Sequence, residues 1–171
     1  MTENFSSLMQ VSSAAELVVL SLDSTSGIEA IATLAGRLVA RGNVTDHQRF
    51  VADVLHREEQ FSTELPWGIA MPHARSTAVR DFAIAIGRSD EGFFWNSESE
   101  EATRLVVMLA APDAKDGSDF IEVLSALAKA LLDEEFREAM LSSGDAGALI
   151  GTFAERVPLN RDNHYNPDNP A

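Results

Sequence analysis

The chain contains no cysteine, which excludes several kinds of site. A disulfide framework, a cysteine-based metal centre and a thiol redox site all need residues that the sequence does not hold. Long hydrophobic runs are also missing, because the longest, residues 105–112, is far too short to cross a bilayer. Residues 1–5 lack the basic start and long apolar core of a signal peptide. We therefore expect a cytoplasmic protein with no segment inserted in a membrane.

Basic residues are scarce: 13 lysines and arginines stand against 27 acidic residues, and the net charge is −14. A protein that binds nucleic acid needs a basic face to displace counterions from phosphates, so nucleic acid is not the expected partner. The acidity favours a basic protein partner instead. One acidic cluster could form such a surface, although a charge run of this kind is also typical of a solvated loop. The cluster comprises Asp90, Glu91, Glu98, Glu100 and Glu101.

Four histidines raise the question of a metal site. His47 and His56 lie on one predicted helix, but they are nine positions apart and point to roughly opposite faces. No two histidines have the i, i+4 spacing of a zinc-binding helix, and His164 lies in a polar C-terminal segment. We expect neither a metal ion nor any other cofactor.

Two amphipathic helices are predicted in the first third of the chain. Apolar residues recur at helical spacing from Ile28 to Leu38. The polar turn 23–26 before them is expected to supply the N-cap, and the Arg-Gly-Asn sequence at 41–43 is expected to end the helix. A second helix is expected to start at Thr45 and to fray near Gln60.

Short apolar segments without a helical stripe predict strands at 17–20, 82–86 and 105–109. The last of these has no polar face, so it is expected to lie in the centre of a sheet. From residue 121 to 155 the apolar pattern is helical again. Strands interleaved with helices indicate an α/β fold, in which a mixed β-sheet is sandwiched between α-helices in a single domain.

The chain length suits one domain with a hydrophobic core, since 171 residues with 45% hydrophobic content would be cramped as two. We expect a flexible N-terminus over residues 1–10 and a folded domain over 11–156. A disordered tail is expected over 157–171, because this segment holds three prolines and four asparagines with few apolar groups.

His73 stands out because a glycine and a proline frame the turn that contains it. Residues 68–75 read Gly-Ile-Ala-Met-Pro-His-Ala-Arg. Pro72 fixes its own φ and pushes the preceding residue towards an extended conformation, so the chain is expected to reach His73 as the end of a strand. We expect the imidazole to be presented to solvent rather than buried. A single histidine after a proline can be an ordinary turn residue, but the surrounding pattern favours a functional one.

A second polar group of residues closes the second predicted helix. Residues 57–63 read Arg-Glu-Glu-Gln-Phe-Ser-Thr, which brings the guanidinium of Arg57 and the hydroxyl of Thr63 into one loop region. Arg57 could instead offset the dipole at the C-terminus of the helix. Arg75 could perform the same task as Arg57, and the sequence does not separate the two.

Together these segments resemble the signature of the enzyme IIA (EIIA) domain of the bacterial sugar phosphotransferase system (PTS), fructose/mannitol type (type 2). The shared pattern is Arg-Glu, a few residues, Thr, a short spacer, then Gly-hydrophobic-Ala-hydrophobic-Pro-His. The resemblance runs from about residue 17 to about residue 153, and the expected type 2 EIIA domain spans 11–156. The segments that carry the resemblance include Gly92-Phe93-Phe94-Trp95, the apolar strand ending at 109–112 and the helix at 121–128. The fold of this family is consistent with the α/β sandwich.

The resemblance implies a phosphotransferase component with a phosphohistidine intermediate. His73 would accept phosphate from the phosphocarrier protein HPr and pass it to a cysteine on a cognate enzyme IIB. That partner works with the membrane enzyme IIC in sugar uptake and phosphorylation. Fructose is the favoured sugar type, and galactitol- and mannitol-type systems stay open. Arg57 would stabilise the phosphate and Thr63 would donate a hydrogen bond near the phosphoryl group. Ser76 is a further candidate on proximity alone.

One departure from the family pattern concerns Phe120. Many members carry a second histidine just before the hydrophobic residue that opens the helix at 121–128, and phenylalanine cannot donate a hydrogen bond to a phosphoryl oxygen. The alternative function is therefore a regulatory, IIA-like interaction protein that signals through its phosphorylation state without transport. A hydrolase with His73 as general base would need a paired carboxylate or a serine nucleophile pattern, which the sequence does not show.

Overall fold

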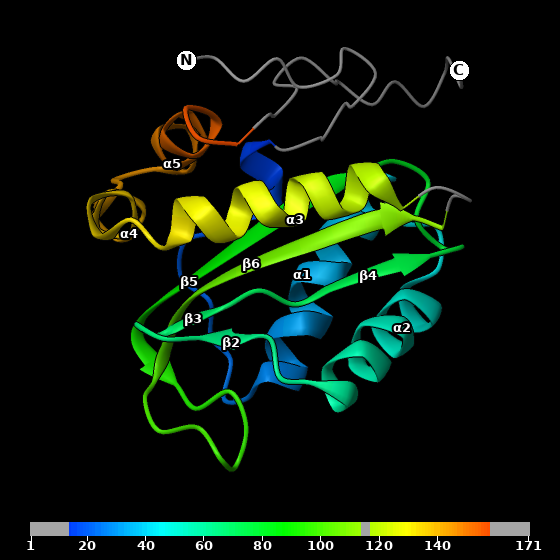
Figure 1. Ribbon diagram of the computed structural model, residues 1–171, viewed down its shortest axis with the longest axis horizontal. Coiled ribbons are helices and arrows are strands. Elements are labelled where there is room, and N and C mark those ends of the chain that lie inside the picture. The colour runs from blue at the N-terminus through cyan, green and yellow to red at the C-terminus, as the bar shows by residue number, and fades with distance from the viewer. Residues whose placement is uncertain (1–13, 114–116, 158–171) are drawn as a thin grey trace.

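The computed structural model describes residues 14–113 and 117–157 (Figure 1). The N-terminus predicted over 1–10 lies outside the described residues. So does the predicted tail, with the exception of Val157, which is buried in the core.

A six-stranded mixed sheet forms the centre of the described structure. The strand order is β1-β5-β6-β3-β2, and β4 pairs with β6 further along the edge that β3 occupies. Strand β6 pairs antiparallel with β5 and parallel with both β3 and β4, which confirms its predicted central position. The strands are β1 (Val18–Val19), β2 (Glu64–Leu65), β3 (Ile69–Ala70), β4 (His73–Ser76), β5 (Ala83–Phe93) and β6 (Thr103–Pro112).

Helices cover both faces of this sheet, as the α/β sandwich prediction requires (Figure 1). Helices α1 (Gly27–Arg41) and α2 (His47–Gln60) lie on one face. The opposite face carries α3 (Ser118–Leu131), α4 (Glu134–Ser142) and α5 (Ala146–Ala154), and the short 3₁₀ helix η1 (Ala15–Leu17) precedes β1. The predicted fold class is confirmed.

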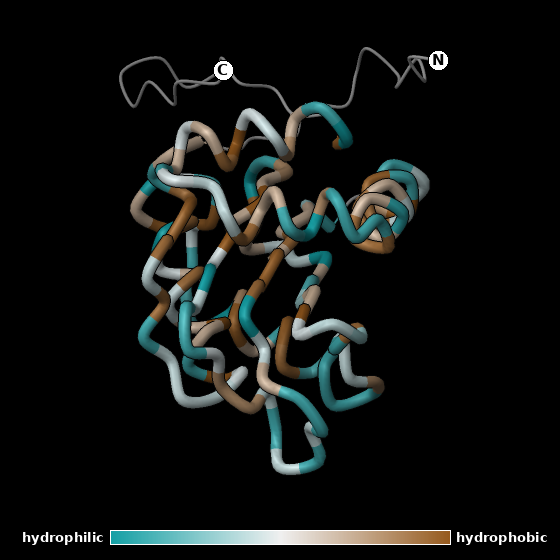
Figure 2. Tube along the Cα trace, turned by 90° about the vertical axis from the view of Figure 1, so that its left-hand side faces the viewer, coloured by the Kyte–Doolittle hydropathy of each residue, from teal (hydrophilic) through white to brown (hydrophobic). Residues whose placement is uncertain are grey.

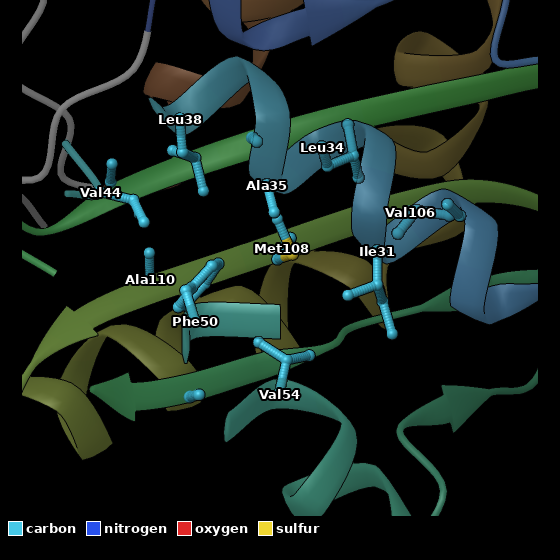
Figure 3. Packing of buried hydrophobic residues seen from close by; sticks show 14 of the residues in the cluster. Ile31, Leu34, Ala35, Leu38, Val44, Phe50, Val54, Val106, Met108 and Ala110 are labelled. Carbon is cyan, nitrogen blue, oxygen red and sulfur yellow. The ribbon is translucent and has the colours of Figure 1, made fainter. Parts of the chain in front are cut away.

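Alternation along the strands divides the core into two halves. In β5, Ala83 and Ala85 face α1 and α2, whereas Ile84 and Ile86 face α3 to α5. The small alanines let α1 approach the sheet closely. Figure 3 shows the first half, in which side chains of α1 and α2 close over β6. The labelled residues are Ile31, Leu34, Ala35, Leu38, Val44, Phe50, Val54, Val106, Met108 and Ala110.

Burial of this apolar surface holds the layers together. Phe50 and Met108 are fully buried, and burying one such side chain contributes about 1.5–3 kcal/mol. In Figure 2 the strand segments inside the molecule are brown, whereas the loop between β5 and β6 at the bottom is teal and white. The hydropathy pattern therefore follows the layers.

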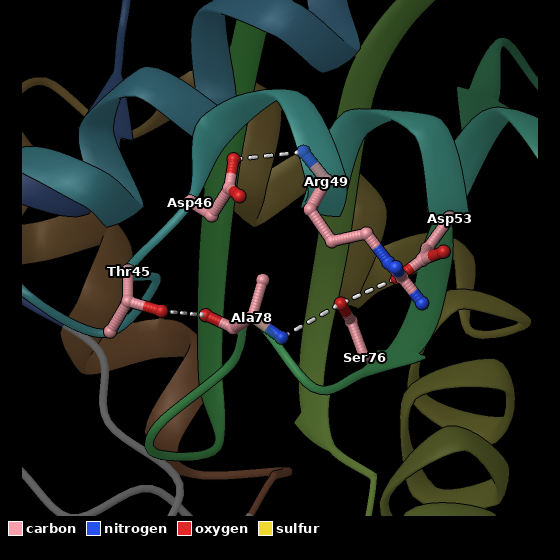
Figure 4. Close-up of polar contacts among 6 residues, drawn as sticks. All are labelled: Thr45, Asp46, Arg49, Asp53, Ser76 and Ala78. Carbon is pink, nitrogen blue, oxygen red and sulfur yellow. Dashed lines mark hydrogen bonds and ion pairs between the residues drawn. The ribbon is translucent and has the colours of Figure 1, made fainter.

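The ends of α1 and α2 can be compared with the helix ends predicted from the sequence. Ser26 caps α1 through its hydroxyl, which accepts from the Glu29 N–H at 3.3 Å, and Gly42 ends it at a φ of 87°, as predicted. Helix α2 ends at Gln60, also as predicted, but its N-cap is Asp46 rather than Thr45. The Thr45 hydroxyl donates to the Ala78 carbonyl at 3.1 Å instead, which ties the helix start to the turn after β4 (Figure 4).

Strand β5 is longer than the predicted 82–86 and runs on to Phe93. It forms a hairpin with β6, and the pairing to Thr103 carries the strand past the end of its apolar segment, with a register shift between Arg88 and Phe93. Asp90 and Glu91 of the acidic cluster therefore lie on a strand and not in a loop. The first predicted strand, 17–20, is reduced to the two residues of β1.

Candidate functional site

His73 is the first residue of β4, not the end of a strand as predicted. Strands β3 and β4 follow one another along the same side of β6, with Ile69 paired to Leu105 and His73 paired to Leu109. The break between them contains Pro72, which has no N–H to give to a ladder. Its carbonyl accepts from the Leu109 N–H at 3.1 Å, so the chain keeps its course past the proline.

The expectation that the imidazole is presented to solvent is wrong, because His73 is only 6% exposed. Proline sets the direction of the chain, but tertiary packing covers the face towards which His73 points. The ring of Phe120, in the first turn of α3, lies over the imidazole with 5.6 Å between ring centroids and 51° between ring planes. Phe120 itself is half-buried and packs against the core half beneath α3.

A backbone contact fixes the protonation pattern of the ring. His73 Nδ1 lies 2.9 Å from the carbonyl oxygen of Met71, and because a carbonyl oxygen only accepts, Nδ1 must carry the hydrogen. The neutral ring then has its lone pair on Nε2. Burial lowers the pKa of His73 below its ordinary value of 6.5; the Met71 carbonyl raises it, the Arg57 guanidinium lowers it and the Glu58 carboxylate raises it. The site therefore favours a neutral imidazole with a free Nε2.

Arg57 lies in the last turn of α2, close enough to His73 to act on its pKa. Its Nη1 donates to the carbonyl of Phe61 at 2.9 Å, so the capping role considered from sequence is observed. The same position puts a permanent positive charge beside the imidazole. Capping and electrostatic action on His73 are thus combined in one side chain.

Glu58 is the residue of this region that the sequence analysis did not assign. Its carboxylate accepts from the Thr63 hydroxyl at 2.6 Å, from the Thr63 N–H at 2.9 Å and from the Trp95 indole N–H at 2.8 Å. The Thr63 carbonyl in turn accepts from the Met71 N–H at 3.0 Å. A continuous series of hydrogen bonds thus joins Trp95, Glu58, Thr63, Met71 and His73.

Only part of this series had a signal in the sequence. Glu58 lies in the Arg-Glu pair of the motif and five residues before Thr63, a spacing that suits a side chain folding over a helix end. Nothing in the sequence points from Glu58 to Trp95, which is 37 residues away. The structure brings them together because α2 and the end of the β5 segment pack on the same core half.

Ser76 and Arg75 lie on opposite faces of β4. The Ser76 hydroxyl donates to Asp53 Oδ2 of α2 at 2.6 Å and accepts from the Ala78 N–H at 3.1 Å (Figure 4). Strand alternation places it on the face opposite to His73. Arg75 shares the face of His73 and forms an ion pair with Asp113 at 3.7 Å. Arg57 is thus close enough to act on the pKa of His73, and Thr63 contacts the neighbouring Met71 N–H through its carbonyl. Arg75 shares the face of His73, whereas Ser76 is directed towards α2.

Neither a metal-binding cluster nor a membrane-spanning helix occurs in the described ranges. Over residues 14–113 and 117–157, no three histidine, aspartate or glutamate side chains are grouped so that they could hold a metal ion. His47 places its Nε2 3.0 Å from the Ala32 carbonyl, and His56 contacts Gln60. Within the same ranges, every helix is too short or too polar to cross a membrane.

Comparison with known proteins identifies related sequences over most of the chain. Residues 13–155 match the family described as "Phosphoenolpyruvate-dependent sugar phosphotransferase system, EIIA 2". The PTS fructose-specific EIIA component of Haloferax volcanii is 32% identical over 128 residues, which are 75% of this chain and 82% of that protein. The PTS 2-O-alpha-mannosyl-D-glycerate-specific EIIABC component of Escherichia coli is 33% identical over 133 residues, 77% of this chain. The chain spans only 20% of that relative, and 17% of the fructose-specific EIIABC component of Bacillus subtilis.

Solved structures share the fold. The crystal structure of IIA mannitol from Escherichia coli superposes with a TM-score of 0.69 at 27% identity, covering 83% of this chain and 99% of that one. The same fold occurs in a complex of enzyme IIAMTL with phosphorylated enzyme IIBMTL from Escherichia coli, with a TM-score of 0.72 at 26% identity over 85% of this chain and 99% of that chain. With residues 68–75 placed on β3 and β4 of this fold, the chain belongs to the EIIA type 2 family of the phosphoenolpyruvate-dependent sugar phosphotransferase system, a family of phosphotransferase components.

Proposed function

We propose that this chain is a cytoplasmic phosphocarrier that accepts a phosphoryl group from HPr on His73 and passes it to a cognate enzyme IIB. The observation that carries the proposal is the hydrogen bond from His73 Nδ1–H to the Met71 carbonyl at 2.9 Å. It holds the ring in the tautomer whose Nε2 lone pair is available as a nucleophile. The family membership supplies the reaction class.

The two transfer steps balance without a net change of protons at His73. Nε2 attacks the phosphorus, an N–P bond forms, and the bond between phosphorus and the donor nitrogen breaks with its electron pair left on the donor. In the second step a cysteine thiolate of enzyme IIB attacks the phosphorus and the N–P bond breaks, which returns the lone pair to Nε2. The hydrogen on Nδ1 keeps its bond to the Met71 carbonyl throughout. The lowered pKa of His73 favours this cycle, because a protonated Nε2 has no lone pair to donate.

Arg57 is the residue proposed to stabilise the transferred phosphoryl group. Phosphoryl transfer depends on positive charge and dipoles that face the equatorial oxygens, and the Arg57 guanidinium already acts on His73 electrostatically. The Thr63 hydroxyl is the second candidate donor near the phosphoryl group, and to act directly it must leave Glu58 Oε2. Its carbonyl already positions Met71. Ser76 is the weakest candidate for a contact with the phosphoryl group, since its hydroxyl donates to Asp53.

Fructose is the sugar type that we propose for the transport system. Two of the relatives named above, from Haloferax volcanii and Bacillus subtilis, are fructose-specific, whereas one from Escherichia coli is specific for mannosylglycerate. The complex of enzyme IIAMTL with phosphorylated enzyme IIBMTL supports an enzyme IIB as the acceptor. The sugar itself would be handled by the membrane enzyme IIC.

Intact-mass analysis tests the proposal. The chain is incubated with phosphoenolpyruvate, enzyme I and HPr, and compared with His73→Ala. We expect one acid-labile phosphoryl group on the native chain and none on the variant. Addition of a fructose-type enzyme IIB should then discharge the phosphorylated chain. A native chain that stays unphosphorylated would contradict the proposed mechanism.

Phe120 favours one alternative, a regulatory IIA-like protein that signals through its phosphorylation state. Phe120 stands at the sequence position where many family members carry a second histidine, its ring lies 5.6 Å from the His73 ring between centroids, and it offers no hydrogen bond to a phosphoryl oxygen. Regulation predicts phosphorylation on His73, no discharge to any enzyme IIB, and a partner whose affinity changes on phosphorylation. The discharge step of the same experiment therefore separates the two functions.

A further inference from the structure

The ring of Phe120 and the burial of His73 belong to one arrangement. His73 is 6% exposed, and the ring of Phe120 lies at a centroid distance of 5.6 Å from its imidazole. Phe120 is itself half-buried at the start of α3. A nucleophile that is almost fully covered cannot meet a donor at the 3–3.5 Å separation that reaction requires until something moves. In this structure the His73 site is therefore covered.

Phe120 is placed so that it can move without disturbing the sheet. It lies three residues after Gly117, the N-cap of α3, and a glycine has no side chain with which to cap that helix end. The imidazole, by contrast, is held by β4 pairing to β6 and by the Met71 carbonyl. Motion of the aromatic side chain or of the first turn is therefore the easier way to expose His73 than motion of β4.

We propose that Phe120 is a specificity-determining residue, whose ring shields His73 from small phosphodonors and admits only a protein donor that displaces it. This inference rests on the proposed phosphocarrier function. A docking protein buries about 800 Å² on each partner and can use that binding energy to turn one aromatic side chain aside. A small phosphodonor such as phosphoramidate makes too few contacts to do so. The hydrogen-bonding role of a second histidine is thereby replaced by control of access.

Chemical modification tests the shielding independently of phosphoryl transfer. Diethyl pyrocarbonate acylates the unprotonated nitrogen of an accessible imidazole, and peptide mass mapping gives the rate at each histidine. Exposed His56 serves as the internal reference. In Phe120→Ala we expect the rate at His73, relative to His56, to rise about tenfold, as loss of one aromatic contact would allow. The matched control is Ile121→Ala, a truncation in the same turn at a side chain that is 62% exposed, and it should leave the His73 rate unchanged.

A general loosening of the fold is distinguished by His47, whose ring contacts the Ala32 carbonyl at the other end of α2 from Arg57. Acceleration confined to His73 supports the proposal. If the labelling rate of His47 also rises in Phe120→Ala, Phe120→Leu is measured instead, because leucine keeps the apolar packing. Faster labelling of His73 alone in Phe120→Leu supports the proposal, and an unchanged His73 rate overturns it. An equal His73 rate in the native chain and Phe120→Ala also overturns it.

Phosphoramidate extends the test to the reaction itself. Its P–N bond breaks as Nε2 forms the new N–P bond, and ammonia leaves after taking a proton from water. We expect phosphoramidate to label His73 about tenfold faster in Phe120→Ala than in the native chain, by the same loss of contact. Equal rates would overturn the specificity role. If HPr fails to phosphorylate the native chain while both small probes show the expected shielding, the proposed function fails and the shielding stands.

Discussion

Replacing Glu58 by alanine should destabilise the whole fold, although Glu58 is only half-buried. The change removes the acceptor of four hydrogen bonds, two from Thr63, one from the Trp95 indole and a longer one from the Ser62 hydroxyl at 3.4 Å. A hydrogen bond to a charged group contributes about 1.5–3 kcal/mol, and leaving a buried donor without a partner costs about 1–3 kcal/mol. Trp95 is 3% exposed, so water cannot readily replace the lost acceptor. Since these bonds share one carboxylate and are not additive, we expect a loss of about 3 kcal/mol in the free energy of unfolding.

Urea denaturation, followed by tryptophan fluorescence, measures this loss. With a typical slope of about 2 kcal/mol per molar, the midpoint should fall by about 1.5 M while the slope stays the same. Glu59→Ala is the matched control, since it removes the same charge from an exposed neighbour on α2 and should shift stability by under about 0.5 kcal/mol. A loss below about 1 kcal/mol in Glu58→Ala, the value of an exposed ion pair, would refute the view that Glu58 joins α2 to the His73 segment.

Three further predictions concern other parts of the site. Burial lowers the folded-state pKa of His73 below its unfolded value of about 6.5. This group therefore contributes stability that is present above about pH 6.5 and is lost as the pH falls through the folded pKa. At pH values below about 6.5 the urea midpoint of the native chain should decrease, and it should decrease less in His73→Gln. Ser76→Ala should lower the free energy of unfolding by about 1–3 kcal/mol, since it removes the hydroxyl that donates to Asp53 and takes the acceptor away from the buried Ala78 N–H, and a wild-type urea midpoint would contradict this. Phe61 is 79% exposed and its carbonyl accepts from Arg57, so if it forms part of the surface that docks HPr, Phe61→Ser should slow phosphorylation by HPr about tenfold. Phe94→Ser, the same substitution just after β5, is the control and should leave the rate unchanged, and equal rates in both variants would exclude Phe61 from that surface.

The sequence was informative about the local elements. The polar turn 23–26 and the Arg-Gly-Asn sequence at 41–43 marked the ends of α1 correctly, because capping chemistry acts between residues only three or four positions apart. The apolar run at 105–109 predicted a central strand, since both of its faces are buried. Where a partner distant in the chain supplied the stabilisation, the boundaries moved: β5 runs on to Phe93 because β6 pairs with it there.

The same distinction between local and long-range information applies to the candidate site. Its composition was readable from the chain alone, since the Arg-Glu, Thr and Pro-His pattern singled out His73, Arg57 and Thr63. Its geometry was not. Pro72 gave the direction of the chain, and the family pattern put position 120 near the phosphoryl group. The sequence held no sign, however, that the Phe120 ring would lie over the imidazole, nor that Trp95 and Thr63 would share the Glu58 carboxylate.

By itself, the amino-acid sequence determined the fold class, the family and the identity of the candidate nucleophile, because each depends on short-range periodicity or on residues close together in the chain. Only the tertiary structure decided that His73 is buried, that its hydrogen sits on Nδ1 and that Ser76 faces away from it. These features arise where β4, α2 and α3 meet. Burial and hydrogen-bond geometry at such a junction depend on how separate elements pack, and packing is a property of the folded chain as a whole.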